Sequence, residues 1–324
     1  MTTRGRFAAG VLTAAAGALL LAYQIHLVGW ERIQTNLSQV SGWFAAILAV
    51  SFGRFVLRSI AWTTLVAERS TLAPAIEATL AGDALGNLTP LGLAASEPAK
   101  AIFLGRSVAS SRILPALAVE NFFYSVSVAM YIMAGAAVML TMFAVPPPLQ
   151  WAGVVALAGM AAVLAGAAWL AWQRPQVLSG MLSRLPVPKL AAVVDRVREF
   201  ETQTYGTVGG QRGRLMRVIA CHAGFHALSF AECWLTLGLL TGDSRPAAAF
   251  VLDTVNRVVN IVFKVVPAQV GVGQWSSETF AQAIGIPVGK GTALGLVRLG
   301  RLLVWAAVGI LILVTRGSRS KESG

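Results

Sequence analysis

Residues 121–173 read NFFYSVSVAMYIMAGAAVMLTMFAVPPPLQWAGVVALAGMAAVLAGAAWLAWQ and contain no Asp, Glu, Lys, Arg or His. Three consecutive prolines at 146–148 are the only interruption of the apolar run. Each apolar stretch beside them is long enough for the roughly 20 residues that a membrane-spanning helix needs. This part of the chain therefore predicts a helical hairpin that crosses a bilayer twice.

The whole composition agrees with a membrane protein. Of 324 residues, 56% are hydrophobic and 12% are charged, whereas soluble domains usually carry about 25% charged residues. The net charge of +12 could suggest nucleic acid as a partner. The basic residues gather at the ends of apolar segments, as orientation signals and headgroup contacts do, so we expect no nucleic-acid binding.

Six apolar segments are long enough to span: 7–29, 42–67, 113–142, 149–172, 215–240 and 289–314. The first exceeds the usual apolar core of a signal peptide and lacks a polar cleavage region, which favours a retained helix. Sixteen Lys or Arg lie at the N-terminus, within 68–112, within 173–214 and after Thr315, while the alternate loops hold little more than Arg32 and Arg245. The positive-inside rule then predicts a bacterial-type inner membrane protein with both termini cytoplasmic.

Two further segments, 74–105 and 247–286, are apolar but broken. The first has about 14 residues before Asn87, roughly 21 Å of helix, which is too short to cross a 30 Å hydrocarbon core. We expect a re-entrant hairpin there. About 19 residues precede Pro267 in the second segment, so a full span followed by a half helix is an alternative. The even number of spans and the basic tail favour a second hairpin.

These segments divide a single membrane domain into two halves of one plan, span, span, hairpin, span. Half 1 covers about 7–142 and half 2 about 149–314, with a cytoplasmic linker at about 173–213 and a tail at 316–324. The linker is either an amphipathic interfacial helix or a solvated one. Because the halves start on opposite sides, the fold class is an all-α polytopic membrane protein with an inverted-topology repeat, and a binding site is expected where the broken segments meet.

Arg54 and Arg58 lie in the middle of the second span, four residues apart on one helix face. Charge at the centre of a bilayer costs roughly 2.5–3.5 kcal/mol on insertion scales, so each needs an anionic partner. A carboxylate, Glu120 or Glu97, or a lipid phosphate would serve. Similar polar groups occur in the other predicted membrane segments: Arg298, Arg301, Glu232, Asp253, Asn256, Arg257, Asn260 and Lys264. All of them must face protein or water rather than lipid.

Motifs for catalysis and metal binding are weak. GIPVGKGT, from Gly285, has the wrong spacing for a phosphate-binding loop. His222 and His226 beside Cys221 lack the Glu of a zinc-protease helix, and Cys221 and Cys233 are too far apart on one helix for a disulfide. We therefore expect no cofactor, no metal and no catalytic residue.

Two stretches carry a family resemblance. In GNLTPLGLAASEPAK, residues 86–100, the positions Asn87, Pro90, Gly92, Glu97 and Lys100 resemble the first signature of the lysylphosphatidylglycerol synthase transmembrane-region, or flippase-like, family. A Pro-Gly-Gly-x-Gly-x-x-Glu turn is the second signature, and PAQVGVGQ resembles it at Pro267 and Gly271. It departs at Ala268, Gln269 and Gln274. Pro90 precedes Glu97 by seven residues, as Pro267 precedes Gln274.

The resemblance implies a protein that moves a polar lipid between leaflets. We expect an anionic or glycosylated headgroup to be bound by Arg54, Arg58, Asn87, Glu97, Lys100, Glu120, Arg298 and Arg301. Pro90, Gly92, Pro267, Gly271 and Gln274 are expected at the hairpin tips. Two alternatives are a membrane-embedded enzyme that modifies a lipid and a scaffold for a separate lipid-synthesis enzyme. The soluble aminoacyl-transferase domain of some relatives is missing from this sequence.

Overall fold

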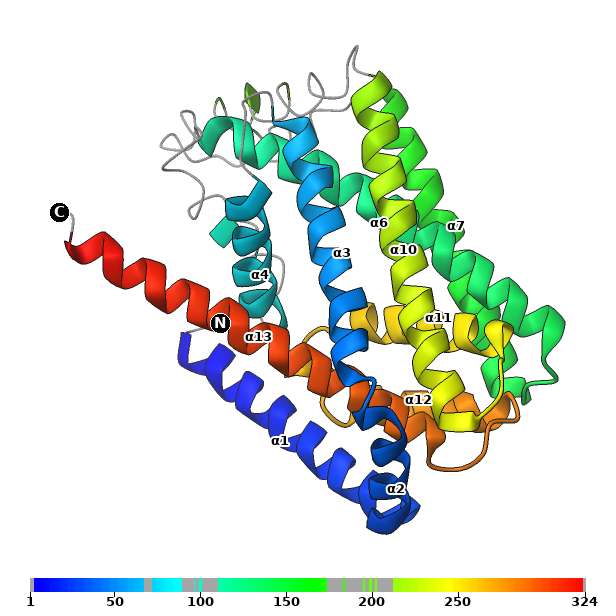
Figure 1. The fold of residues 1–324 in the computed structure, drawn as a ribbon. Helices are drawn as coiled ribbons and strands as arrows, with labels where there is room; N and C mark the ends of the chain where they lie inside the picture. Colours follow the sequence, from blue (N-terminus) through cyan, green and yellow to red (C-terminus); the bar gives the residue numbers. More distant parts are fainter. Residues whose placement is uncertain are drawn as a thin grey trace.

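The computed structural model describes residues 3–66, 72–88, 96, 99–100, 110–173, 183, 195, 198–199, 202 and 212–322. Its regular elements are all helical in these parts of the chain (Figure 1). They are α1 (Thr3–Val28), α2 (Trp30–Ser41), α3 (Phe44–Leu65), α4 (Leu72–Leu88), α6 (Ser110–Met142), α7 (Pro147–Gln173), α10 (Arg212–Thr241), α11 (Pro246–Val262), the short 3-10 turn η2 (Pro267–Gln269), α12 (Val272–Ala283) and α13 (Lys290–Glu322). The predicted all-α polytopic fold is confirmed.

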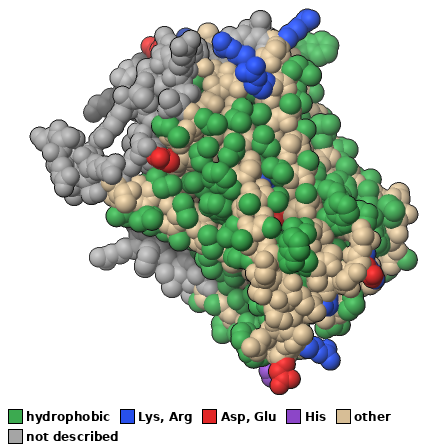
Figure 2. All heavy atoms as spheres, viewed as in Figure 1, with side chains coloured by type: hydrophobic (Ala, Val, Ile, Leu, Met, Phe, Trp, Pro, Cys, Tyr) green, Lys and Arg blue, Asp and Glu red, His purple; other side chains and the backbone are tan. Residues whose placement is uncertain are grey.

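Five helices in the described residues are long and apolar enough to cross a membrane, namely α3, α6, α7, α10 and α13. The sixth predicted span corresponds to α1, whose 26 residues would measure roughly 39 Å and whose Ala15–Val28 part is apolar. Hydrophobic side chains are spread over the middle of the face drawn in Figure 2, and the charged side chains visible there lie mainly near its margins. The protein is a multi-pass membrane protein.

The connections between the helices gather at two opposite ends of the bundle. The end of α3 and the starts of α4, α6 and α10 lie at the upper end in Figure 1, whereas the α6–α7 and α10–α11 connections lie at the lower end. The linker predicted at 173–213 falls almost wholly outside the described residues. The tail predicted from residue 316 continues α13 as helix up to Glu322.

The first broken segment begins as α4, whose 17 residues would extend roughly 25 Å. Its predicted tip at Pro90 and Gly92 lies outside the described residues. The backbone of Ser96 and the side chain of Lys100 lie against Gly82 of α4, where a Cβ would meet both. The chain has therefore doubled back on α4 by residue 100, as a hairpin requires.

The second broken segment is a helix, a break and a helix: α11, residues 263–271 and α12. Arg245 Nη1, just before α11, donates a 3.3 Å hydrogen bond to the carbonyl of Gly285, just after α12. The two ends of the segment therefore meet, and α11 and α12 pack on each other. This geometry favours the predicted hairpin over a full span followed by a half helix.

The helices pack in a pattern that the two halves share. α3 and α10 form the central pair, and each broken segment packs on the last span of the other half, α4 on α13 and α11 on α6. Glycines allow these close contacts: a Cβ on Gly309 would meet the carbonyl oxygen of Leu80 in α4, and one on Gly135 would meet Thr254 in α11. These interhelical contacts bring polar residues of both halves to the same place.

Two features of the fold were not predicted. Residues 30–41 form the short amphipathic helix α2, which buries Ile33, Asn36 and Val40 where it packs on α10 and α13. In α12, Glu278 caps the start of α13, because its Oε1 accepts a 2.6 Å hydrogen bond from the Gly289 N–H and its Oε2 accepts one of 2.6 Å from the Thr292 N–H. A buried carboxylate at the positive end of a helix is favourable, and it holds α12 against the last span.

Candidate functional site

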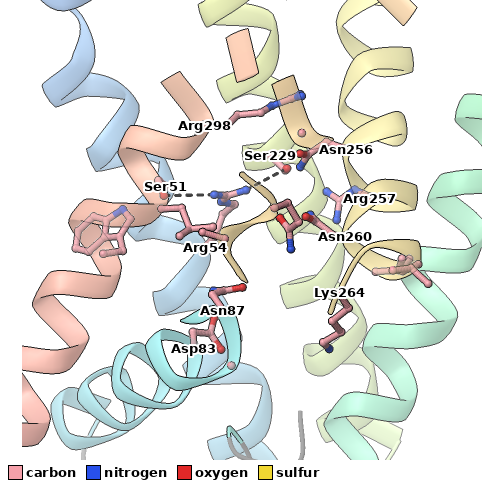
Figure 3. A pocket seen from close by; sticks show the side chains of 18 of the residues that line it. Ser51, Arg54, Asp83, Asn87, Ser229, Asn256, Arg257, Asn260, Lys264 and Arg298 are labelled. Atoms are coloured by element: carbon pink, nitrogen blue, oxygen red, sulfur yellow. Dashed lines mark hydrogen bonds between the residues drawn. The ribbon is translucent and has the colours of Figure 1, made fainter. Parts of the chain in front are cut away.

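A cavity of about 560 Å³ lies among the helices of both halves. Its walls come from α3, α4, α6, α7, α10, α11, α12 and α13 and from the break after α11. Figure 3 shows Arg54 of α3, Asn87 of α4 and Asn260 of α11 lying around one common space. Ligand pockets usually measure about 300–1,000 Å³, so this cavity is large enough for a lipid headgroup.

One ion-pair group is centred on Glu232 of α10, which is buried. Arg54 of α3 approaches its Oε2 at 3.2 Å, and Arg301 Nη1 donates to both carboxylate oxygens at 2.6 Å. Arg54 also donates to the hydroxyls of Ser51 and Ser229, at 3.3 and 3.2 Å. Glu232 thus joins the two halves, and both arginines line the cavity.

A second group is centred on Asp253 of α11, also buried. Its Oδ2 accepts hydrogen bonds from the Tyr131 hydroxyl at 2.8 Å and from Arg257 Nη2 at 3.2 Å, and its Oδ1 accepts one from Ser229 at 3.0 Å. Arg298 lies 4.0 Å from the same Oδ1. The Arg257 guanidinium also stacks over the Tyr131 ring, at 4.3 Å from its centroid. Asp253 therefore fixes two arginines at the cavity wall.

A third group surrounds Arg58. Its Nε donates to Glu120 at 3.3 Å, its Nη2 donates to Asn121 at 3.1 Å, and its Nη1 lies 3.5 Å from Asp83. Lys100, buried on the returning arm of the first hairpin, lies 3.7 Å from the same Asp83 oxygen. Asp83 thus ties the hairpin to α3. Glu120 is fully buried behind Arg58.

Positive charge is in excess around the cavity. Seven cationic side chains and four carboxylates lie in these groups or in the cavity wall, an excess of three positive charges among the described residues. Arg54 Nε and Arg257 Nε are buried and donate no hydrogen bond within the described part of the chain. In a site of low dielectric such an excess favours a bound anion. Phosphate suits it, because guanidinium groups match phosphate geometry well.

The break of the second hairpin forms part of the cavity wall. Ala268 and Gln269 adopt left-handed backbone conformations, with φ of 52° and 47°, which glycine accepts far more readily than other residues. They occupy the two positions at which the sequence departs from the Gly-Gly of the family signature. Gly271, at φ 79°, donates its N–H to Gln274 Oε1 at 2.7 Å, and Gln274 Nε2 donates to the Gly295 carbonyl at 3.1 Å. Gln274 therefore fastens the turn to α13, a role that a neutral amide fills.

The predicted site residues lie as follows. Arg54, Arg58, Asn87, Arg298 and Arg301 line the cavity, while Lys100 and Glu120 pair with its lining residues. Glu97 lies outside the described residues. For the arginines of α3 the sequence suggested Glu120, Glu97 or a lipid phosphate as partner; Arg58 does contact Glu120, whereas Arg54 pairs with Glu232. The reason is that α3 packs along α10, which brings Glu232 beside Arg54.

Several lining residues were not predicted as part of the site. Asp83 could have been found, because it lies four residues before Asn87 and therefore on the same face of α4. Asn256, Arg257, Asn260 and Lys264 were recognised as membrane-embedded polar groups but not placed together. The structure brings their side chains to the same cavity (Figure 3).

The histidines of α10 do not form a metal centre within the described residues. His226 Nε2 lies 3.0 Å from the Ser127 hydroxyl, and His222 Nε2 lies 3.9 Å from Glu120. Each histidine thus contacts α6 rather than the other histidine. Cys221 and Cys233 are both buried and free, as their spacing predicted.

Comparison with known proteins decides the family. The model of the family described as "Lysylphosphatidylglycerol synthase TM region" matches residues 7–313. The chain belongs to this family. No curated protein and no solved structure matches it at a significant level. Membership of the lysylphosphatidylglycerol synthase transmembrane-region family associates this membrane protein with lipid handling, and the match runs across α1 to α13.

Proposed function

We propose that this protein moves a lipid with a phosphate-bearing headgroup between the two leaflets, and that the headgroup passes through the cavity between its halves. The observation that carries the proposal is the ring of six cationic side chains in the cavity wall: Arg54, Arg58, Arg257, Lys264, Arg298 and Arg301. Charges among membrane helices are costly to bury unless they are paired, and they usually mark a functional site. The carboxylates offset only part of this charge, and a phosphate would offset more.

The packing pattern supports an inverted repeat. In both halves the broken segment lies against the last span of the other half, and α3 and α10 pair at the centre. An inverted repeat gives a site near the bilayer midplane that can open to either side when one half rocks against the other. The Arg54–Glu232 pair and the Tyr131–Asp253 hydrogen bond cross between the halves. These contacts would have to rearrange during such a motion.

The cavity also has an apolar side suited to a lipid tail. Val128 and Ala129 of α6, Met160 and Val163 of α7 and Ile261 of α11 line it. Val163 and Ile261 are 44% and 51% exposed on the molecular surface, so this side reaches the lipid-facing exterior. A headgroup could occupy the polar part while its acyl chains stay in the bilayer.

Orientation, location and partners follow as parts of the proposal. α10 begins at the upper end of the bundle in Figure 1, and the basic residues Arg212, Arg214 and Arg217 belong to its first turns. The positive-inside rule would make that end cytoplasmic, in a bacterial-type inner membrane with both termini inside. Transport would be facilitated or ion-coupled, and a separate enzyme would supply the lipid.

Purified protein in liposomes tests the proposal against its two alternatives. Tail-labelled phosphatidylglycerol is placed in both leaflets, and a membrane-impermeant quencher reports how fast the inner pool reaches the outside. The proposal expects faster exchange with the lipid chemically unchanged. A new lipid product detected by mass spectrometry would instead indicate an enzyme. Exchange no faster than in protein-free liposomes would contradict the proposal and favour a scaffold.

A further inference from the structure

Four amide side chains in the cavity wall make no hydrogen bond within the described residues: Asn87, which is exposed near the end of α4, and three on the second hairpin. Asn256 and Asn260 are one helical turn apart on α11, and Gln269 lies in the break that follows; all three line the cavity, and Figure 3 labels the two asparagines there. None of the three side chains makes a hydrogen bond to a residue in the described ranges. An amide among membrane helices that lacks a partner is costly. These three groups are therefore available to a ligand or to water.

Other amides in the same wall differ clearly from these three. Asn121 accepts from Arg58 and donates to the Leu117 carbonyl. Gln274 accepts from the Gly271 N–H and donates to the Gly295 carbonyl. In both residues the amide oxygen and the amide nitrogen are used by contacts within the protein. The contrast marks the amides without a partner, including the three on the second hairpin, as candidates for recognition.

The backbone at Gln269 gives a second, independent observation. Its φ of 47° lies in the left-handed region, where a side chain is disfavoured and glycine would fit without strain. The chain nevertheless carries an amide there, and Gln269 lines the cavity. A residue kept in a strained conformation beside a pocket suggests a function for its side chain.

The chemistry of an amide narrows the class of ligand. Guanidinium and ammonium groups only donate hydrogen bonds, and a phosphate diester only accepts them, so the arginines suffice for the phosphate. An amide both donates and accepts, and a phosphate diester would use only its NH2 group. A hydroxyl group both donates and accepts and therefore matches it. An ammonium could also donate to the carbonyl, but the excess of three positive charges among the described residues around the cavity opposes a cationic headgroup.

We propose that the lipid of this site carries hydroxyl groups attached through its phosphate, as a polyol or sugar phosphate ester does, and that Asn256, Asn260 and Gln269 bind these hydroxyls. The inference rests on the proposed phosphate site and specifies its substrate class. It excludes as preferred ligands both a bare phosphate lipid and a lipid whose headgroup bears an added amino-acid ammonium. Glycerol and sugar headgroups share the required chemistry.

Native mass spectrometry of the purified full chain can test this selectivity. Phosphatidylcholine bilayers are supplied with equal amounts of phosphatidylglycerol, phosphatidylinositol, phosphatidic acid and lysylphosphatidylglycerol, and the lipids retained by the protein are counted. At least one of the first two should exceed phosphatidic acid and lysylphosphatidylglycerol by about tenfold or more, because each neutral hydrogen bond changes affinity by roughly two- to twelvefold. The ratio of phosphatidylglycerol to phosphatidylinositol distinguishes a glycerol-sized from a sugar-sized group.

Matched variants distinguish the hydroxyl inference from the phosphate site on which it rests. Asn256→Leu with Asn260→Leu should remove the preference while phosphatidic acid still binds, whereas Gln39→Leu, which changes an amide on α2 outside the cavity wall, should leave it intact. Equal retention of phosphatidylglycerol, phosphatidylinositol and phosphatidic acid by the wild type would overturn the hydroxyl inference alone, as would a preference that survives the double change. If phosphatidic acid too is retained no better than phosphatidylcholine, the phosphate site fails and the inference fails with it.

Discussion

Replacing Glu232 with Gln removes the carboxylate that Arg54 and Arg301 share. At 3.2 and 2.6 Å, and with an effective dielectric constant of about 20, each pair has a Coulomb energy of roughly 5–6 kcal/mol. The cost of burying the charges offsets much of this energy. Measured losses on removing one partner of a buried pair are about 3–5 kcal/mol, because the other charge is left uncompensated. We take that range for Glu232→Gln.

Thermal unfolding in detergent, followed by intrinsic fluorescence, is the assay. A chain of this size shifts by roughly 2 °C for each kcal/mol, so Glu232→Gln should lower the melting temperature by about 6–10 °C. Asp243→Asn is a close control, since Asp243 pairs with Arg245 at 3.1 Å with side chains 62% and 39% exposed. Such surface pairs contribute about 0–1 kcal/mol. Equal shifts for the two variants would refute the view that Glu232 holds the halves together.

Three further changes test the fold around the site, all by the same melting assay. Gly309→Ala should lower stability by about 1–3 kcal/mol, because its Cβ would meet the Leu80 carbonyl of α4. Gly300→Ala, whose Cβ would make only ordinary van der Waals contact with the Phe44 ring, should be neutral or mildly stabilising. Ala268→Gly should raise stability by about 0.5–1 kcal/mol by relieving the positive φ. Glu278→Ala should cost about 2–3 kcal/mol, because two backbone N–H groups at the start of α13 lose a charged acceptor.

The opposite result for each variant would show which contact is absent from the protein. If Gly309→Ala left the melting temperature unchanged, α4 and α13 would have to lie farther apart than in the structure. A destabilising Ala268→Gly would mean that the break does not hold residue 268 in a left-handed conformation. If Glu278→Ala left the melting temperature unchanged, the cap on α13 would not form in the membrane protein.

The sequence predicted the positions of the helices better than the contacts between them. Uncharged runs such as 121–173 fix the spans because the bilayer sets their length, and the break at Pro267 was visible because proline and glycine interrupt a helix. α2 was missed although Ile33, Asn36 and Val40 have helical spacing, since its 12 residues are too short and polar for a search based on apolar runs.

The ion pairs could be predicted only in part. Arg54 and Arg58 were recognised as needing anionic partners, but the choice of Glu232 for Arg54 depends on the register of α3 against α10, 178 positions apart in sequence. Membrane helices are apolar on most sides, so hydropathy does not show which face meets which neighbour. The positive φ of Gln269 likewise cannot be read from a residue type that rarely adopts it.

If the cationic cavity carries a phosphate-bearing headgroup across the membrane, reducing its charge should slow transport. We therefore compare the rate of phosphatidylglycerol exchange between leaflets for two variants: Lys264→Gln, which changes an exposed cation of the cavity wall, and Arg245→Gln, which changes a partly exposed cation outside that wall. At equal protein abundance in the liposomes, we expect at least a severalfold loss for Lys264→Gln and a wild-type rate for Arg245→Gln. Equal rates for both variants would contradict transport through this cavity.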